Sequence, residues 1–161
     1  MRTHSHISGF GLIEIIIAST LVSMATVSLA YVFILSARLN DQTIERTRAH
    51  FLAEEGLEVV RHLRDKGWTA NIKTLSTNTP YYFVFDTASS QWSLTTTPQS
   101  TIDGVFSRTL VVSPVSRDVS DNIVLSGGTN DIDTLKAVSM VTWGGSQSVQ
   151  IPTYITNMFN N

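Results

Sequence analysis

The chain begins with a short polar stretch that is followed by a long hydrophobic run. From residue 10 to residue 35 there are 26 residues, of which 19 are hydrophobic and only one, Glu14, is charged. A helix of this length rises about 39 Å at ~1.5 Å per residue, which exceeds the ~30 Å hydrocarbon core of a bilayer. The pattern therefore predicts a transmembrane helix over residues 10–35.

A cleavable secretory signal is an alternative explanation of the same run. Arg2 precedes it, and the small residues of Ser28-Leu29-Ala30 have a spacing that suits cleavage. The hydrophobic region of a typical signal peptide has only ~7–15 residues. Because the run is longer and carries Glu14 near its start, we favour a retained helix.

The helix is expected to continue as an amphipathic segment over residues 36–66, because no proline or glycine interrupts it before Gly56. Hydrophobic and small residues recur there at steps of three and four, which predicts one buried face. These residues are Ala49, Leu52, Gly56, Val59, Val60 and Leu63. The charged residues Glu54, Glu58, Arg61, Arg64 and Asp65 fall on the opposite side. Gly67 follows a basic last turn and is expected to cap the helix.

Residues 67–161 have a different composition, with 28 Ser and Thr among the 93 residues after Trp68 and all four prolines of the chain. Short β-branched and aromatic runs alternate there with turn residues. Strands are predicted at about 81–86, 91–95, 105–113, 135–143 and 148–154, with a hairpin turn at Gly144-Gly145-Ser146. One face of the third strand is expected to hold Phe106, Arg108, Leu110 and Val112. The fold class is therefore α+β, with a long N-terminal helix packed on an antiparallel sheet.

Composition and motifs exclude several functions. The formal net charge is −2 and no segment is strongly basic, so direct nucleic-acid binding is not expected. There is no cysteine, which excludes disulfides and thiolate chemistry. The chain has no phosphate-binding loop, zinc-protease motif or nucleophile elbow, and we expect neither an enzyme nor a cofactor.

Two groups of residues have side chains that could bind a metal ion. His50 with Glu54, and Glu58 with His62, have helical i, i+4 spacing, which is common by chance on a charged helix. The oxygen-rich stretch 127–133 offers Asp131 and Asp133 as a weak Ca²⁺ candidate, but it lacks the full spacing of a calcium loop. We favour a plain turn at 127–133 and expect no metal.

Glu14 is the residue that needs an explanation beyond simple anchoring. A carboxylate at the centre of a transmembrane helix costs on the order of 2.5–3.5 kcal/mol, and somewhat less near the interface, unless it meets a cation. In an isolated single-span protein, it would reach headgroups or water. In an assembly, a neighbouring subunit can supply the cation.

The residues Gly9-Phe10-Gly11-Leu12-Ile13-Glu14, after a nine-residue leader and before a hydrophobic helix, resemble the processing site of type IV pilins and pseudopilins. The resemblance implies cleavage after Gly9 by a prepilin peptidase, N-methylation of Phe10 and a role for Glu14 in subunit assembly. The amphipathic stretch 51–65 with Trp68 also resembles a sequence that recurs in bacterial minor pilin-like proteins.

The resemblance divides the chain into a leader (residues 1–9), a transmembrane or filament-core helix (10–35), its amphipathic continuation (36–66) and a β-rich head (67–161). It implies a structural subunit, a minor pilin or pseudopilin, of a type IV pilus-like or type II secretion-like filament. The expected partners are other subunits, the prepilin peptidase, a membrane assembly platform and the lipid bilayer. The protein would cross the cytoplasmic membrane once, with an extracytoplasmic head that joins a periplasmic or cell-surface filament. The alternative is a membrane-tethered binding or adhesion domain with an uncleaved anchor.

Overall fold

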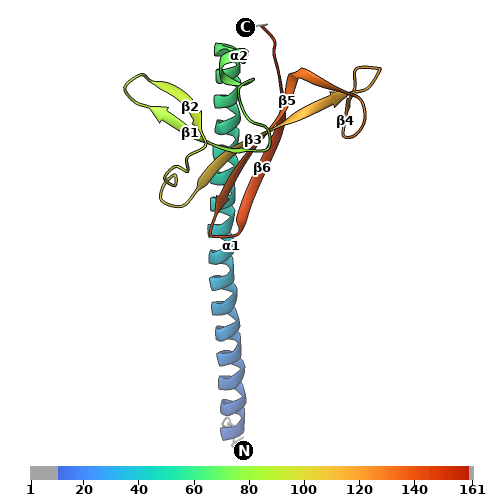
Figure 1. Cartoon of the computed structure of the whole chain (residues 1–161). Helices are drawn as coiled ribbons and strands as arrows, with labels where there is room; N and C mark the ends of the chain where they lie inside the picture. The colour runs from blue at the N-terminus through green and yellow to red at the C-terminus, as the bar shows by residue number, and fades with distance from the viewer. Residues whose placement is uncertain (1–10, 160–161) are drawn as a thin grey trace, which may run out of the picture. The chain divides into compact units, whose positions relative to one another are not determined.

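The structure is a computed structural model that describes residues 11–159. It divides into two compact units, Met1–Ile44 and Glu45–Asn161. Helix α1 spans Leu12–Lys66 and contributes residues to both units (Figure 1). The predicted end of the long helix near residue 66 is confirmed.

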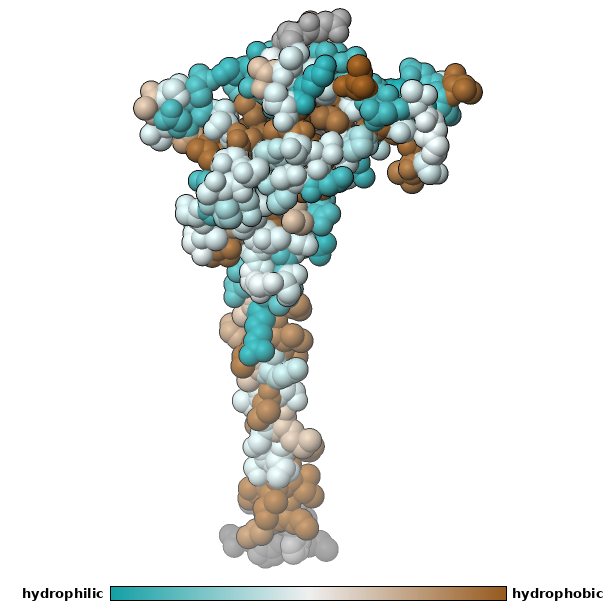
Figure 2. Space-filling model, viewed as in Figure 1, coloured by the Kyte–Doolittle hydropathy of each residue, from teal (hydrophilic) through white to brown (hydrophobic). Residues whose placement is uncertain are grey.

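The described part of the first unit is the N-terminal portion of α1. All its side chains are exposed, including large hydrophobic ones such as Leu12, Ile13 and Leu29. The hydrophobic colouring of this portion is plain in Figure 2. By length and composition, α1 is able to cross a membrane.

The second unit combines the C-terminal portion of α1 with a six-stranded antiparallel sheet. Its elements are the short helix α2 (Trp68–Asn71) and the strands β1 (Pro80–Asp86), β2 (Gln91–Thr95), β3 (Ser107–Arg117), β4 (Ile123–Val124), β5 (Thr129–Trp143) and β6 (Gln147–Thr156). The strand order is β2-β1-β3-β5-β6, and β4 pairs with β3 (Figure 1). The expected α+β layout of one long helix and a C-terminal antiparallel sheet is confirmed.

The core of this unit lies between α1 and one face of the sheet, in two clusters. The larger joins Val59, Val60 and Leu63 of α1 to residues of β1, β3, β5 and β6, and the smaller joins Ala49 and Ala53 to Phe106 and others. The predicted helix stripe is therefore buried, except that Leu52 is only partly so. Leu110 is fully buried on the predicted face of β3, and Val141 of β5 is fully buried as well.

A glycine sets the distance between α1 and the sheet. A Cβ at Gly56 would lie 2.6 Å from Ser139 Oγ, and 3.2 Å from both Arg108 Cδ and Phe83 Cζ. Real Cβ atoms do not approach other atoms to 2.6 Å, so a larger residue here must displace the sheet or its side chains. Gly56 is retained in the helix for packing, although glycine costs ~1 kcal/mol relative to alanine in a helix interior.

We expect Gly56→Ala to lower the free energy of unfolding of the second unit by ~1 kcal/mol, because overpacking of ~1–3 kcal/mol exceeds the gain in helix propensity. Ser139→Ala removes the closest atom, a buried hydroxyl without a hydrogen-bond partner in the described part of the chain, and should be neutral or stabilising. Gly56→Ala should therefore cost less in a Ser139→Ala background. Thermal unfolding of the full chain in non-ionic detergent, followed by tryptophan fluorescence, measures this because all three tryptophans lie in the second unit. Equal costs in both backgrounds would contradict the proposed clash.

Several local predictions were wrong. Strand β3 continues through Pro114 to Arg117, and β5 begins at Thr129, so that part of the stretch predicted to be a turn is extended. Helix α2 and strand β4 were not predicted. Gly67 has φ 161° and ψ 108°, an extended conformation that precedes α2, so it does not adopt the left-handed cap expected at the end of α1.

Candidate functional site

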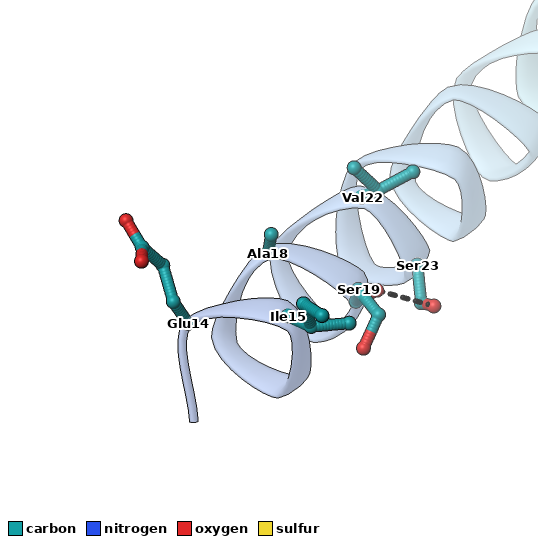
Figure 3. Close-up of a pocket in the computed structure, with 6 residues that line it drawn as sticks. All are labelled: Glu14, Ile15, Ala18, Ser19, Val22 and Ser23. Carbon is teal, nitrogen blue, oxygen red and sulfur yellow. Dashed lines mark hydrogen bonds between the residues drawn. The ribbon is translucent and has the colours of Figure 1, made fainter. Parts of the chain in front are cut away.

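Glu14 lies in the first described turn of α1 and borders a shallow groove along one side of the helix. The other lining residues are Ile15, Ala18, Ser19, Val22 and Ser23. Figure 3 shows the Glu14 side chain extending away from the helix at one end of this row. The groove has only small or branched side chains beside the carboxylate, which leaves room for another helix to approach.

The hydroxyl side chains of the same segment bond to the helix itself. Ser19 donates to the Ile16 carbonyl at 2.9 Å, and Ser23 donates to the Ser19 carbonyl at 2.7 Å, the bond drawn in Figure 3. Equivalent bonds to carbonyls three or four residues earlier are made by Thr20, Thr26 and Ser28. These side chains therefore need no external partner in a lipid environment.

The Glu14 carboxylate differs from these hydroxyls. It is exposed, and no hydrogen bond or ion pair joins it to any residue within the described range 11–159. Its place near the start of α1 agrees with the helix dipole, which favours an acidic group in the first turn by ~0.3–1 kcal/mol. A charge at the centre of a membrane helix costs ~2.5–3.5 kcal/mol, and less near the interface. The Glu14 carboxylate thus has no cationic partner within the described residues to offset that cost.

Gly9 and Phe10, the predicted cleavage and methylation residues, lie outside the described residues. The first described residue, Gly11, has open space around the position that a Cβ would take. Hydrogen bonds from the Glu14 and Ile15 amides to the Gly11 carbonyl begin the helix at this point.

The Ca²⁺ candidate residues lie in a polar cavity of about 560 Å³ at one end of β3 and β5. Arg117 Nε donates to Asp131 Oδ2 at 2.7 Å, and Arg117 Nη1 donates to the Asp121 carbonyl at 2.8 Å. The Asp131 backbone lies in β5, and the Asp133 side chain accepts from Asn157 at 3.3 Å. The Arg117 guanidinium thus occupies the position beside Asp131 that a Ca²⁺ ion would need. Among the residues that the structure describes, no group of three His, Asp or Glu side chains is placed to hold a metal.

Arg117 also lowers the pKa of the Asp131 carboxyl, with a further contribution from Thr134. Because the pKa is lower in the folded state, the unfolded chain binds more protons below about pH 4, and stability falls as the pH drops through that range. We expect Asp131→Asn to flatten the dependence of the melting temperature on pH between about pH 2.5 and 5. The comparison uses wild type and variant in the same detergent. An unchanged slope would show that this ion pair does not contribute to acid unfolding.

Arg108, which the sequence places on the same face of β3 as Phe106 and Leu110, links the sheet to α1. The Arg108 side chain is 5% exposed, and its Nη1 lies 3.0 Å from both the Leu52 carbonyl oxygen and Glu55 Oε2. Its guanidinium carbon stands 4.7 Å from the centre of the Phe83 ring and 5.8 Å from that of Trp92. These contacts bury the charge among protein groups, so Arg108 stabilises the packing of helix on sheet.

On the outer side of α1, His50 Nδ1 lies 3.5 Å from Glu54 Oε1, and Glu58 pairs with Arg61. Both involve exposed side chains, and such pairs contribute only ~0–1 kcal/mol each. They form a solvated helix surface.

No family model, curated protein or solved structure matches the chain.

Proposed function

We propose that this chain is a structural subunit, a minor pilin or pseudopilin, of a filament related to type IV pili or type II secretion filaments. The observation that carries the proposal is the Glu14 carboxylate, which has no partner within residues 11–159, in a helix segment whose hydroxyls from Ser19 to Ser28 all bond to the helix's own carbonyls. A helix that served only as an anchor has no need of a carboxylate within its hydrophobic run. A helix that assembles with copies of itself can use such a carboxylate, if each copy brings a cation to pair with it.

Cleavage after Gly9 supplies that cation in this proposal, as the new amine of Phe10. Phe10 precedes Glu14 by four residues, a rise of about 6 Å along a helix. Two parallel helices offset by that distance bring the amine of one level with the carboxylate of the other. Each charge is then paired only in the assembly, which makes Glu14 a residue that fixes register.

The remaining parts of the chain fit the same function. The membrane-capable portion of α1 anchors the subunit in the cytoplasmic membrane before assembly, in contact with the prepilin peptidase and an assembly platform. The second unit, with its own hydrophobic core, is the extracytoplasmic head. The competing function is that of a binding or adhesion domain, tethered to the membrane by an uncleaved N-terminal anchor.

Mass spectrometry of the N-terminus of the protein purified from cell membranes or filaments tests the proposal. N-methylated Phe10 as the first residue is the expected result. An intact Met1 would favour a tether, and a new N-terminus near Ala30 would identify a secretory signal.

Replacing Gly9 gives a second test, because a bulky side chain next to the cut should obstruct the peptidase. We expect Gly9→Leu to accumulate in the membrane with residues 1–9 attached, with processing almost abolished. Gly11→Leu is the matched control, since the position lies after the cut and its Cβ meets no neighbour. Normal maturation of Gly9→Leu would contradict the proposed cleavage.

A further inference from the structure

The two edge strands of the sheet differ from the strands between them. Strands β2 and β6 end the order β2-β1-β3-β5-β6, and within the described residues each pairs with only one other strand. Neither contains a charged residue, whereas β1, β3 and β5 all do. Exposed edges in soluble proteins are usually guarded against pairing by charges, especially lysine. Neither edge carries a protective charge, and β6 is interrupted only by Pro152.

The hydrogen-bonding direction of β6 follows from its pairing with β5. The Asn157 amide donates to the Asp133 carbonyl at 2.8 Å, and the register continues without a bulge through Thr134↔Thr156 to Trp143↔Gln147. Along an antiparallel strand, residues whose backbone N–H and C=O point toward the paired strand alternate with residues whose backbone groups point away from it. Odd-numbered residues of β6 therefore bond to β5, and even-numbered residues face the open edge.

Pro152 is one of the outward positions and has no amide hydrogen to offer. Prolines on edge strands are tolerated at such positions. The proline therefore divides the free edge into two stretches. The longer stretch, Gln147 to Ile151, precedes the proline and lacks no backbone N–H donor. That stretch is long enough to pair with most of β2, Gln91–Thr95.

The direction of the strands also suits pairing between copies. All four successive pairings from β2 to β6 are antiparallel, so β2 and β6 run in the same direction. Two copies whose α1 helices are parallel and lie on the same side of the joined sheet would then align β2 of one with β6 of the next as a parallel pair. Such contacts between unlike surfaces generate open filaments when the rotation between copies does not close into a ring.

We propose that β2 of one copy adds to residues 147–151 of β6 in a neighbouring copy, so that the sheets of adjacent heads are continuous in the filament. This inference rests on the proposed function, because the offset parallel copies are those of the filament. The partner is a second copy of this chain. It brings an uncharged strand that runs in the same direction as β6.

The absence of native cysteine allows a direct test by cross-linking. In β2, Ser93 is exposed between Trp92 and Leu94, which pack on the core, and in β6 Gln150 is likewise exposed between Val149 and Ile151. Side chains at 93 and 150 therefore lie on the same face of a joined sheet. Filaments of the Ser93→Cys, Gln150→Cys double variant are oxidised and separated under denaturing, non-reducing conditions.

The expected result is a ladder of dimers and larger species from the double variant, lost on reduction. Ser93→Cys combined with Leu125→Cys is the control, since Leu125 is 98% exposed and lies on neither edge strand. Filaments that form normally but give no ladder, or an equal ladder with the control pair, would overturn the inference and leave the proposed function intact. Absence of the wild-type chain from the filaments of cells that express it would overturn both.

A second pair of variants tests the backbone contact without cysteine. Gln150→Pro removes an outward amide that is free within the head, so the melting temperature of the second unit should be unchanged. Filament yield should fall roughly two- to tenfold, the equivalent of one net hydrogen bond per contact. Gln150→Ala keeps the amide and should assemble like wild type. Equal yields for the proline and alanine variants would contradict strand pairing at this edge.

Discussion

Replacing Leu63 by alanine is expected to lower the free energy of unfolding of the second unit by ~2–5 kcal/mol. Leu63 is 5% exposed and lies in the larger core cluster, among residues of α1 and the sheet. Removal of its side chain loses the transfer energy of the buried methylene and methyl groups and leaves a cavity that a tight helix-on-sheet contact cannot fill. The close approach of Gly56 to Ser139 indicates that α1 has little freedom to move inward.

The chain offers a control of identical chemistry. Leu125 is 98% exposed in the loop between β4 and β5, and Leu125→Ala should change stability by less than ~0.5 kcal/mol. Both variants are unfolded as full chains in the same detergent, with the fluorescence of the tryptophans as the signal. A loss below ~0.5 kcal/mol for Leu63→Ala would mean that the buried face of α1 had been assigned wrongly.

The buried face of α1 was predictable because hydrophobic residues on one face of a helix recur in the sequence at steps of three and four. Five of the six residues of the predicted helix stripe are buried (Ala49, Gly56, Val59, Val60 and Leu63), and the sixth, Leu52, is partly buried. Strand β2 was predicted with its observed ends, since turn residues bound its alternating pattern on both sides. Local pattern suffices where one face is apolar and the other polar.

The ends of β3 and β5 were missed for the opposite reason. Residues 129–133 are mostly polar and exposed. Residues 129–131 are extended because they pair with Val115 to Arg117 of β3, across a shift in register after Pro114. The ion pair of Arg117 with Asp131 occurs at this end. A contact between residues fourteen positions apart leaves no periodic signal in either segment.

Arg108 and Glu14 show what sequence can and cannot predict about charged residues. The alternation of β3 placed Arg108 on the inner face, but only the structure shows the Leu52 carbonyl and Glu55 that make this burial tolerable. For Glu14 the anomaly is visible in the sequence, because it is the one charge in a long hydrophobic run. Its proposed partner is in another copy, which the folding of one chain does not reveal.

Glu14→Val should therefore separate assembly from anchoring. If Glu14 pairs with the amine of a neighbouring Phe10, the change leaves that amine buried without a partner, which costs ~3–5 kcal/mol against the assembled state. The same change removes a charge that is costly in lipid, so insertion of the single subunit into the membrane should be unharmed or improved. We expect normal amounts of Glu14→Val in the membrane fraction and a sharp loss from sheared or secreted filaments.

Ser23→Val is the matched control for Glu14→Val, because it places the same new side chain on the same groove and removes only a hydroxyl that bonds to its own helix. Quantitative immunoblots of membranes and filaments measure both variants against wild type. A simple tether predicts no difference between Glu14→Val and Ser23→Val in either fraction. Filament incorporation of Glu14→Val equal to wild type would exclude the proposed ion pair. A loss of both variants from the filaments would instead assign the defect to the shape of the groove, since only the glutamate change removes a charge.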